Sequence, residues 1–156
     1  MRRVIAALTV AVALPVLALA QTAATTNMDI LRQKVKADKK LVVAENLQLT
    51  DAEGAKFWPV YDAYQKELQQ INERLTAVIL AYADAYKKGA VTDATAKKLI
   101  EDAAAVDDAE ATLKRTSLPK ILAVLPAAKA ARYVQIENKI RAVIRYELAA
   151  GIPLVQ

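Results

Sequence analysis

The sequence has neither cysteine nor histidine in its 156 residues. Without cysteine the chain forms no disulfide, although an exported protein could use them. Without histidine it lacks the commonest general base, the commonest metal ligand and the usual pH switch. Because zinc, haem and copper sites normally need one of these two residues, we expect no metal and no other cofactor. The three glycines, at positions 54, 89 and 151, are too scattered for a phosphate-binding loop.

The first twenty residues have the pattern of a secretory signal. Arg2 and Arg3 precede 17 uncharged residues, which end at Ala20 with a small-x-small pattern. This apolar run contains Pro15 and is short for a membrane span. We therefore expect cleavage after Ala20, a periplasmic location and a signal-free chain of 136 residues that forms one domain. An uncleaved membrane anchor is the alternative.

The net charge is low once the signal is removed. Loss of Arg2 and Arg3 lowers the formal net charge from +5 to +3. This value is too small for a nucleic-acid binder, and export takes the protein away from nucleic acid. We therefore expect no nucleic-acid partner.

The rest of the chain predicts an all-α fold with about four helices. Alanine is abundant, and the alternation of β-branched residues that is typical of strands is missing. We assign residues 21–27 to a disordered lead-in, 28–150 to a single helical domain and 151–156 to a C-terminal tail. The helices are expected at about 28–47, 51–88, 93–124 and 126–150. Gly89 and Gly151 mark helix ends, and Thr92 or Asp93 caps the third helix.

A heptad pattern runs along the second helix. Its positions follow one another in steps of four and three residues, and we call them the heptad seam: Phe57, Tyr61, Tyr64, Leu68, Ile71, Leu75, Val78 and Tyr82. Such a repeat predicts packing against another helix along the whole length. At 1.5 Å per residue this helix would be roughly 55 Å long. The length favours long antiparallel helices in an elongated bundle or cradle, kinked at Pro59 and Pro119 and assembled as a homodimer.

Two helix starts share one pattern. Thr50 and Glu53 form a capping box, in which each side chain bonds the backbone amide of the other residue. Residues 49–57 align with residues 125–133, so that a leucine, two alanines and a basic–aromatic pair coincide. Pro126 suits the first helical position, where no amide is needed. We give a structural role to this helix-start motif: Leu49, Thr50, Glu53, Phe57, Leu125, Pro126 and Tyr133. Chance similarity in an alanine-rich chain is the alternative.

The third and fourth helices each have an inner apolar face. In the third helix it comprises Leu99, Ala103, Val106, Leu113, Leu118, Ile121, Leu122 and Leu125. In the fourth helix it comprises Val134, Ile136, Ile140, Val143, Ile144 and Leu148. Two favourable i,i+4 ion pairs are expected, Glu110 with Lys114 and Glu137 with Arg141.

The middle of the third helix is strongly acidic. Its carboxylates belong to Glu101, Asp102, Asp107, Asp108 and Glu110. They lie along a helix, whereas a calcium loop needs ligands that converge from irregular backbone. We therefore expect a solvated face and neither a calcium site nor a catalytic pair of carboxylates.

The candidate contact surface is a basic stripe on the first helix near an aromatic corner. The stripe comprises Arg32, Lys36, Lys39 and Lys40, at helical spacing and away from the apolar face. Trp58 lies outside the heptad seam, among four aromatic residues in positions 57–64. A solvated basic surface and an aromatic core at a helix corner are the structural alternatives. The functional hypothesis is that the stripe and Trp58 contact acidic or unfolded partners.

The stretch Leu-Thr-Asp-Ala-Glu at residues 49–53, in an exported and cysteine-free helical chain, resembles the LTxxQ motif of the Spy/CpxP family of periplasmic proteins. Glu53 stands in place of the glutamine, and the second motif position keeps only Leu125. Residues 46–64 also resemble exported helical proteins of proteobacteria. The resemblance covers most of the signal-free chain. It implies a cradle-shaped antiparallel dimer that binds unfolded clients without ATP during envelope stress.

These features together favour a non-enzymatic protein. We expect an ATP-independent, chaperone-like holdase for unfolded or envelope proteins, and the alternative is an interaction module that regulates an envelope sensor protein. Some members of the resembled family restrain a sensor kinase and others bind zinc, but the missing histidine and cysteine disfavour the zinc branch. An enzyme that uses carboxylates alone is disfavoured because the acidic residues cluster on one helix face. Binding of a membrane surface by the basic first helix is not favoured either.

The expected homodimer gives the first prediction. Size-exclusion chromatography with light scattering on residues 21–156 should report twice the mass of one signal-free chain, because the heptad seam favours packing against a further helix. An added unfolded client should co-elute with the dimer. A mass of one chain would contradict the assembly, and a client that elutes alone would contradict client capture.

Overall fold

The structure, a computed structural model, describes residues 38–89 and 91–155. The chain divides into two compact units, Met1–Lys39 and Lys40–Gln156, and the account below concerns the second. The described residues form four helices and no strand: α2 (Lys39–Leu47), α3 (Asp51–Lys87), α4 (Asp93–Val124) and α5 (Ala127–Gly151). The prediction of an all-α fold with four helices is confirmed.

The predictions for the N-terminal part fall largely outside this description. The signal over 1–20, the lead-in over 21–27 and the segment 28–37 of the first expected helix lie outside the described residues. Asp38 is not helical, and α2 begins at Lys39. The prediction of one unbroken helix over 28–47 is therefore wrong.

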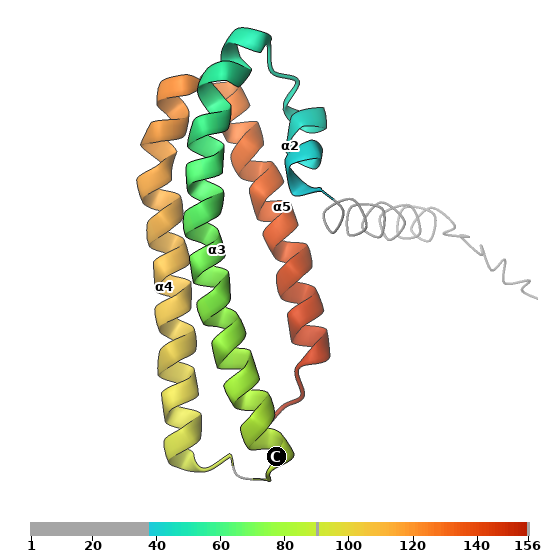
Figure 1. Cartoon of the computed structure of the whole chain (residues 1–156), viewed down its shortest axis with the longest axis vertical. Coiled ribbons are helices and arrows are strands. Elements are labelled where there is room, and N and C mark those ends of the chain that lie inside the picture. The colour runs from blue at the N-terminus through green and yellow to red at the C-terminus, as the bar shows by residue number, and fades with distance from the viewer. Residues whose placement is uncertain (1–37, 90, 156) are drawn as a thin grey trace, which may run out of the picture. The chain divides into compact units, whose positions relative to one another are not determined.

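Helices α3, α4 and α5 run side by side, and α4 is antiparallel to the other two (Figure 1). The turn after α3 is made by Gly89, whose φ of 61° lies in the left-handed region that favours glycine. Thr92 then caps α4 by accepting the amide of Thr95. Helix α2 lies beside the part of the bundle where α3 and α5 begin (Figure 1). The two predicted helix starts are therefore at the same end.

An aromatic cluster forms the core at this end of the bundle. Phe57 and Tyr133 are fully buried, and their ring centroids are 5.1 Å apart in an edge-to-face arrangement. The rings of Tyr61 and Tyr64 lie 6.1 and 6.4 Å from that of Tyr133. We call these four residues the aromatic corner. Pairs of this kind contribute about 0.5–1.5 kcal/mol each beyond the burial of their area. The same core contains Val43, Leu47, Ile121, Leu125 and Ala130.

Polar groups also join the two helix starts. Thr50 accepts the Glu53 amide at 3.3 Å, and the Glu53 carboxylate accepts the Thr50 amide at 2.8 Å, so the predicted capping box is confirmed. Lys129 of α5 donates to the same carboxylate at 2.6 Å and to the Gln48 carbonyl at 3.1 Å. These bonds, first that from Lys129 and then that from Thr50, lower the pKa of Glu53. The repeated start pattern thus brings its two copies into direct contact.

The bounds of α5 differ by about one residue from those expected. Pro126 precedes the helix and accepts the Ala130 amide at 2.9 Å through its carbonyl, so Ala127 takes the first position. Gly151 is the last helical residue, and Ile152 follows it with extended backbone. The prediction that Pro126 would be the first helical residue is therefore wrong.

The heptad seam is buried over only part of its length. Its first five positions, from Phe57 to Ile71, are buried, whereas Leu75, Val78 and Tyr82 are half-buried. The reason is the length of α5, which at 1.5 Å per residue spans about 38 Å against about 55 Å for α3. The predicted packing is therefore tight over the first five positions and looser over the last three, where α4 still runs beside α3.

Several apolar residues of the expected inner faces are not buried, and some polar residues are buried in their place. Leu118 and Leu122 of α4 are exposed, while Glu110 and Ser117 of the same helix are buried. In α5 the buried positions include Tyr133 and Glu137, whereas Val134, Ile136, Ile144 and Leu148 are only half-buried. In each helix the buried positions recur every three or four residues, from Val106 in α4 and from Tyr133 in α5. These positions face the neighbouring helices, and they are buried whether the residue is apolar or polar.

The prolines do not interrupt the helices that contain them. Pro59 lies inside α3 and Pro119 inside α4, and both helices are assigned without a break. Each proline lacks the amide that would bond the carbonyl four residues earlier. The kinks and the dimer remain predictions.

Removal of the Phe57 ring should strongly destabilise the bundle. Phe57→Ala should lower the free energy of unfolding by about 3–5 kcal/mol, because it leaves a cavity beside Tyr133 in the aromatic corner. Leu80→Ala is the matched control on the same helix, where Leu80 is 64% exposed, and it should change stability by less than about 0.5 kcal/mol. Urea unfolding followed by circular dichroism measures both. Equal effects of the two substitutions would contradict the assignment of the core.

Candidate functional site

An open apolar groove lies at the end of the bundle opposite the aromatic corner. No residue of α3 after Ile71 and none of α4 before Val106 is buried. Between these helices and the last turns of α5 is a cavity of about 570 Å³. Ligand sites in proteins commonly have volumes of about 300–1,000 Å³. The groove therefore has the size of a binding site and occupies the place that a longer α5 would fill.

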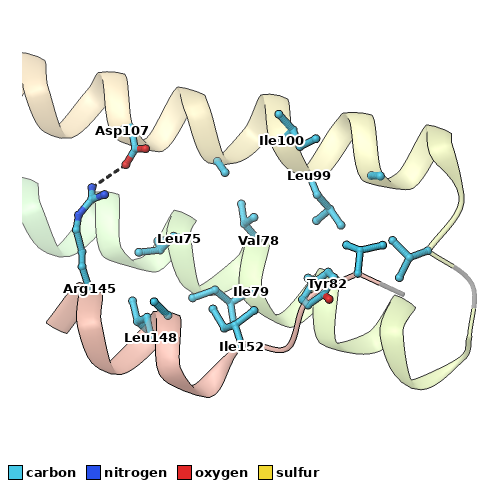
Figure 2. A pocket seen from close by; sticks show the side chains of 15 residues that line it. Leu75, Val78, Ile79, Tyr82, Leu99, Ile100, Asp107, Arg145, Leu148 and Ile152 are labelled. Carbon is cyan, nitrogen blue, oxygen red and sulfur yellow. Dashed lines mark hydrogen bonds and ion pairs between the residues drawn. The ribbon is translucent and has the colours of Figure 1, made fainter.

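The groove is lined almost entirely by aliphatic side chains. They come from α3, the turn before α4, α4 itself, α5 and the segment after α5: Leu75, Val78, Ile79, Val91, Ala96, Leu99, Ile100, Ala103, Leu148, Ala149, Ile152 and Val155. Figure 2 shows Leu75, Val78 and Leu99 on facing helices around the shared space, with Leu148 and Ile152 on the remaining side. Such a lining favours an apolar occupant, because its burial removes apolar surface from water.

Polar groups occur only at the two ends of the groove. At one end Arg145 donates to Asp107 at 2.7 Å, the interaction drawn as a dashed line in Figure 2. At the other end the Tyr82 hydroxyl donates to the Pro153 carbonyl at 2.8 Å. These are the only polar residues among the fifteen that line the groove. The groove thus lacks the unpaired charge that would recognise an ionic ligand.

A buried charge cluster lies next to the groove and joins α4 to α5. Glu110 is only 2% exposed. Both of its carboxylate oxygens accept hydrogen bonds from Arg141, and the distance from Nε to Oε1 is 2.9 Å. Lys114 lies 2.9 Å and Arg145 3.1 Å from the same carboxylate. Arg141 also donates to the Asn72 side chain of α3 at 3.0 Å. The cluster therefore connects all three long helices.

The environment of Glu110 stabilises its ionised form. Burial alone raises the pKa of this carboxyl group, but hydrogen bonds from Arg141 and then Lys114 outweigh burial and lower the pKa to about 2.

The expectation that Glu110 lies on a solvated face is wrong, although its predicted pair with Lys114 is confirmed. Arg141 donates to Glu110, and Glu137 accepts a hydrogen bond from the Gln65 side-chain amide at 3.1 Å, so each member of the predicted pair Glu137–Arg141 has a partner other than the one expected.

A second hollow of about 470 Å³ lies between α4 and α5 beside the aromatic corner. Tyr64, Tyr133 and Glu137 are among its lining residues. The buried Tyr133 hydroxyl has no hydrogen-bond partner among the described residues. Burial, followed by the Glu137 charge, raises its pKa, while the nearby Gln65 slightly opposes this shift without the geometry of a hydrogen bond. This tyrosine is therefore a neutral side chain and no nucleophile.

The predicted contact residues are only partly described. Arg32 and Lys36 lie outside the described residues, whereas Lys39 and Lys40 are in the first turn of α2. Lys40 forms a salt bridge to Asp62 at 2.8 Å and lies 5.2 Å from the centre of the Trp58 ring. Lys40 and Trp58 are thus together, next to the aromatic corner. Trp58 is half-buried, and its role in contacting partners stays a prediction.

The groove contains residues that the sequence assigned to other roles. Leu75, Val78 and Tyr82 were expected to pack inside the heptad seam, and Arg145 and the segment 152–155 had no assigned role. The sequence did contain a signal, because the second expected helix is about thirteen residues longer than the fourth. Over its last turns this seam is only half-buried, although α4 lies alongside α3 there.

Within residues 38–89 and 91–155, no group of three or more carboxylate, histidine or cysteine side chains could hold a metal ion. None of the described helices has the length and hydropathy of a membrane span. A scan of protein-family models, a search of the curated proteins and a search of the solved structures each found no match for this chain. The resemblance to the Spy/CpxP family therefore stays a prediction.

Glu110→Gln should strongly destabilise the protein at pH 7. It leaves Arg141 buried without its charged partner, so the free energy of unfolding should fall by about 3–5 kcal/mol. Asp108→Asn is the control, because Asp108 is an exposed carboxylate on the same helix, and it should change stability by less than about 0.5 kcal/mol. Chemical unfolding measures both values.

The pH dependence of the same variant tests the pKa of Glu110. The folded-state pKa of about 2 lies below the ordinary value of 4.5, so its contribution to stability is fully present above pH 4.5. It is lost as the pH falls through the folded-state value. The wild-type protein should therefore lose more stability than Glu110→Gln between pH 4.5 and pH 2. Parallel pH profiles of the two proteins would contradict this role.

Proposed function

We propose that this protein is an exported, ATP-independent holdase that binds apolar segments of unfolded envelope proteins. The observation that supports this function best is the open groove of about 570 Å³ with its aliphatic lining. Exposed apolar patches on proteins of this size commonly mark interaction sites. The holdase needs no reaction, since it slows aggregation by covering the surface through which unfolded chains associate.

The size and openness of the groove suit a polypeptide segment. Its walls are side chains of α3, α4 and α5, together with Val91 and the segment after α5. Each large aliphatic side chain of a client buried there would contribute about 1.5–3 kcal/mol. The strength of such contacts depends on the apolar area that is buried and little on the client's sequence. A holdase needs this low sequence selectivity, because it binds many different clients.

The surrounding charges support reversible binding and solubility. Lys98 pairs with Asp102 at 2.8 Å on the exposed side of α4, near the groove residue Leu99. Lys97 and Glu101 form a second pair, at 3.9 Å. Exposed charges of both signs keep the surface hydrated while leaving the apolar lining accessible. The basic stripe of Arg32, Lys36, Lys39 and Lys40 would then steer acidic clients toward the protein.

The holdase proposal predicts suppression of client aggregation. Residues 21–156 should suppress the turbidity of reduced α-lactalbumin at near-stoichiometric ratios. This client is suitable because it unfolds when its disulfides are reduced, whereas the reductant has no disulfide to attack in a protein without cysteine. Leu99→Lys places an ammonium in the groove and should raise the concentration needed for half-suppression by about tenfold.

Leu122→Lys is the matched control for the groove. Leu122 is an exposed residue on the same helix and does not line the groove, so its substitution should leave suppression unchanged. Thermal unfolding of both variants shows whether the fold is kept. Unchanged client aggregation at a several-fold excess of the wild-type protein would reject the holdase function.

A specific interaction module for an envelope sensor protein is the second candidate. The same groove would then accept one segment of one partner. A pull-down that captures a single membrane protein in stoichiometric amount, from a protein that fails the aggregation assay, would favour this candidate.

A further inference from the structure

The segment that follows α5 forms part of the wall at one end of the groove. Ile152 and Val155 of this segment line the groove together with Tyr82 of α3. The Tyr82 hydroxyl donates to the backbone carbonyl of Pro153 at 2.8 Å. Figure 2 shows Ile152 near Ile79, and Tyr82 beyond them toward the end of the groove. An apolar peptide segment of the chain itself therefore covers one end of the groove.

The sequence explains why this segment is extended and not helical. Pro153 has no amide to continue the helix, and a residue before proline favours extended backbone. Ile152 has φ −97° and ψ 116°, and its amide still bonds the Leu148 carbonyl at 3.0 Å. The chain thus leaves the helix at Ile152, and the segment that follows lines the end of the groove.

The segment is held by few contacts. Leu154 is 88% and Val155 56% exposed. The bond from Tyr82 lies at an exposed position, where water competes for both of its partners. A client segment with the same chemistry could therefore replace it without disturbing the helices.

We propose that residues 152–155 are an internal competitor of the client, and that the groove binds extended apolar peptide segments through a hydrogen bond from Tyr82 to a backbone carbonyl. This inference rests on the holdase function proposed above. The bound segment shows the class of occupant: aliphatic side chains contact the lining, and the main chain supplies the acceptor. A main-chain acceptor is present in every client, so Tyr82 adds affinity without selecting a sequence.

The competitor limits the access of clients to the groove. A ligand binds a protein with an apparent affinity reduced by the fraction of molecules in which its site is open. While residues 152–155 occupy the end of the groove, only the remaining surface is available to a client. Displacement of the segment opens the whole groove and frees Tyr82 at the same time.

The experiment compares two aspartate substitutions within the segment. Val155→Asp places a carboxylate against the aliphatic lining, which should displace the segment and lower the concentration for half-suppression of α-lactalbumin aggregation by about threefold or more. Leu154→Asp is the matched control, because Leu154 does not line the groove, and it should leave that concentration unchanged. Equal behaviour of the two variants would overturn the inference.

A second comparison tests the hydrogen bond from Tyr82. A chain that ends at Gly151 should suppress aggregation at least as well as Val155→Asp. Addition of Tyr82→Phe to this shortened chain should weaken suppression, since the client then loses its donor. In the full chain the same substitution should have a smaller effect, because it releases the competitor and removes the donor together. No effect of Tyr82→Phe in the shortened chain would overturn the role of Tyr82.

The outcomes separate this inference from the holdase function. If the full chain and every variant leave client aggregation unchanged, the holdase function fails and the inference fails with it. If the full chain suppresses aggregation but Val155→Asp and Leu154→Asp do so equally, only the inference fails. Thermal unfolding of each variant confirms that the helices are intact.

A labelled peptide with the sequence of residues 149–156, followed by fluorescence anisotropy, should bind the shortened chain more tightly than the full chain.

Discussion

The contact between Phe57 and Tyr133 sets the register of the bundle. It places the starts of α3 and α5 at one level, with ring centroids 5.1 Å apart and Lys129 bonded to the capping carboxylate Glu53. From that common level α5 extends for 25 residues and α3 for 37. Because the helices are aligned at one end and unequal in length, the other end lacks a third helix. The groove follows from these two facts.

The charge cluster around Glu110 has a different role from the aromatic corner. Burial of an ion pair is weak evidence for net stabilisation, since both charges lose their hydration. Removal of one partner is nevertheless costly, so α4 and α5 must keep the alignment at which Glu110 meets Arg141. Because Asn72 also contacts Arg141, the alignment includes α3. The cluster thus favours one arrangement of the three helices and positions Arg145 at the edge of the groove.

The proposed function uses the least packed part of the fold. The aromatic corner and the charge cluster hold one end of the bundle and its middle, and the walls of the groove are therefore presented on stable helices. At the open end the half-buried residues Leu75 and Val78 face space that a client segment could fill. Ile152 and Val155 of the segment after α5 cover one end of this surface.

Local patterns by themselves determined the helices, the capping box at Thr50, the turn at Gly89 and the first five positions of the heptad seam. These features depend on backbone geometry and on neighbours within a few residues, so the sequence predicts them. Only the tertiary structure decided that Glu110 is buried, that Leu118 is exposed and that the last positions of the seam line a groove. Each of these outcomes depends on which residue of another helix lies opposite, and on where that helix ends. Spacing along a single helix contains neither piece of information.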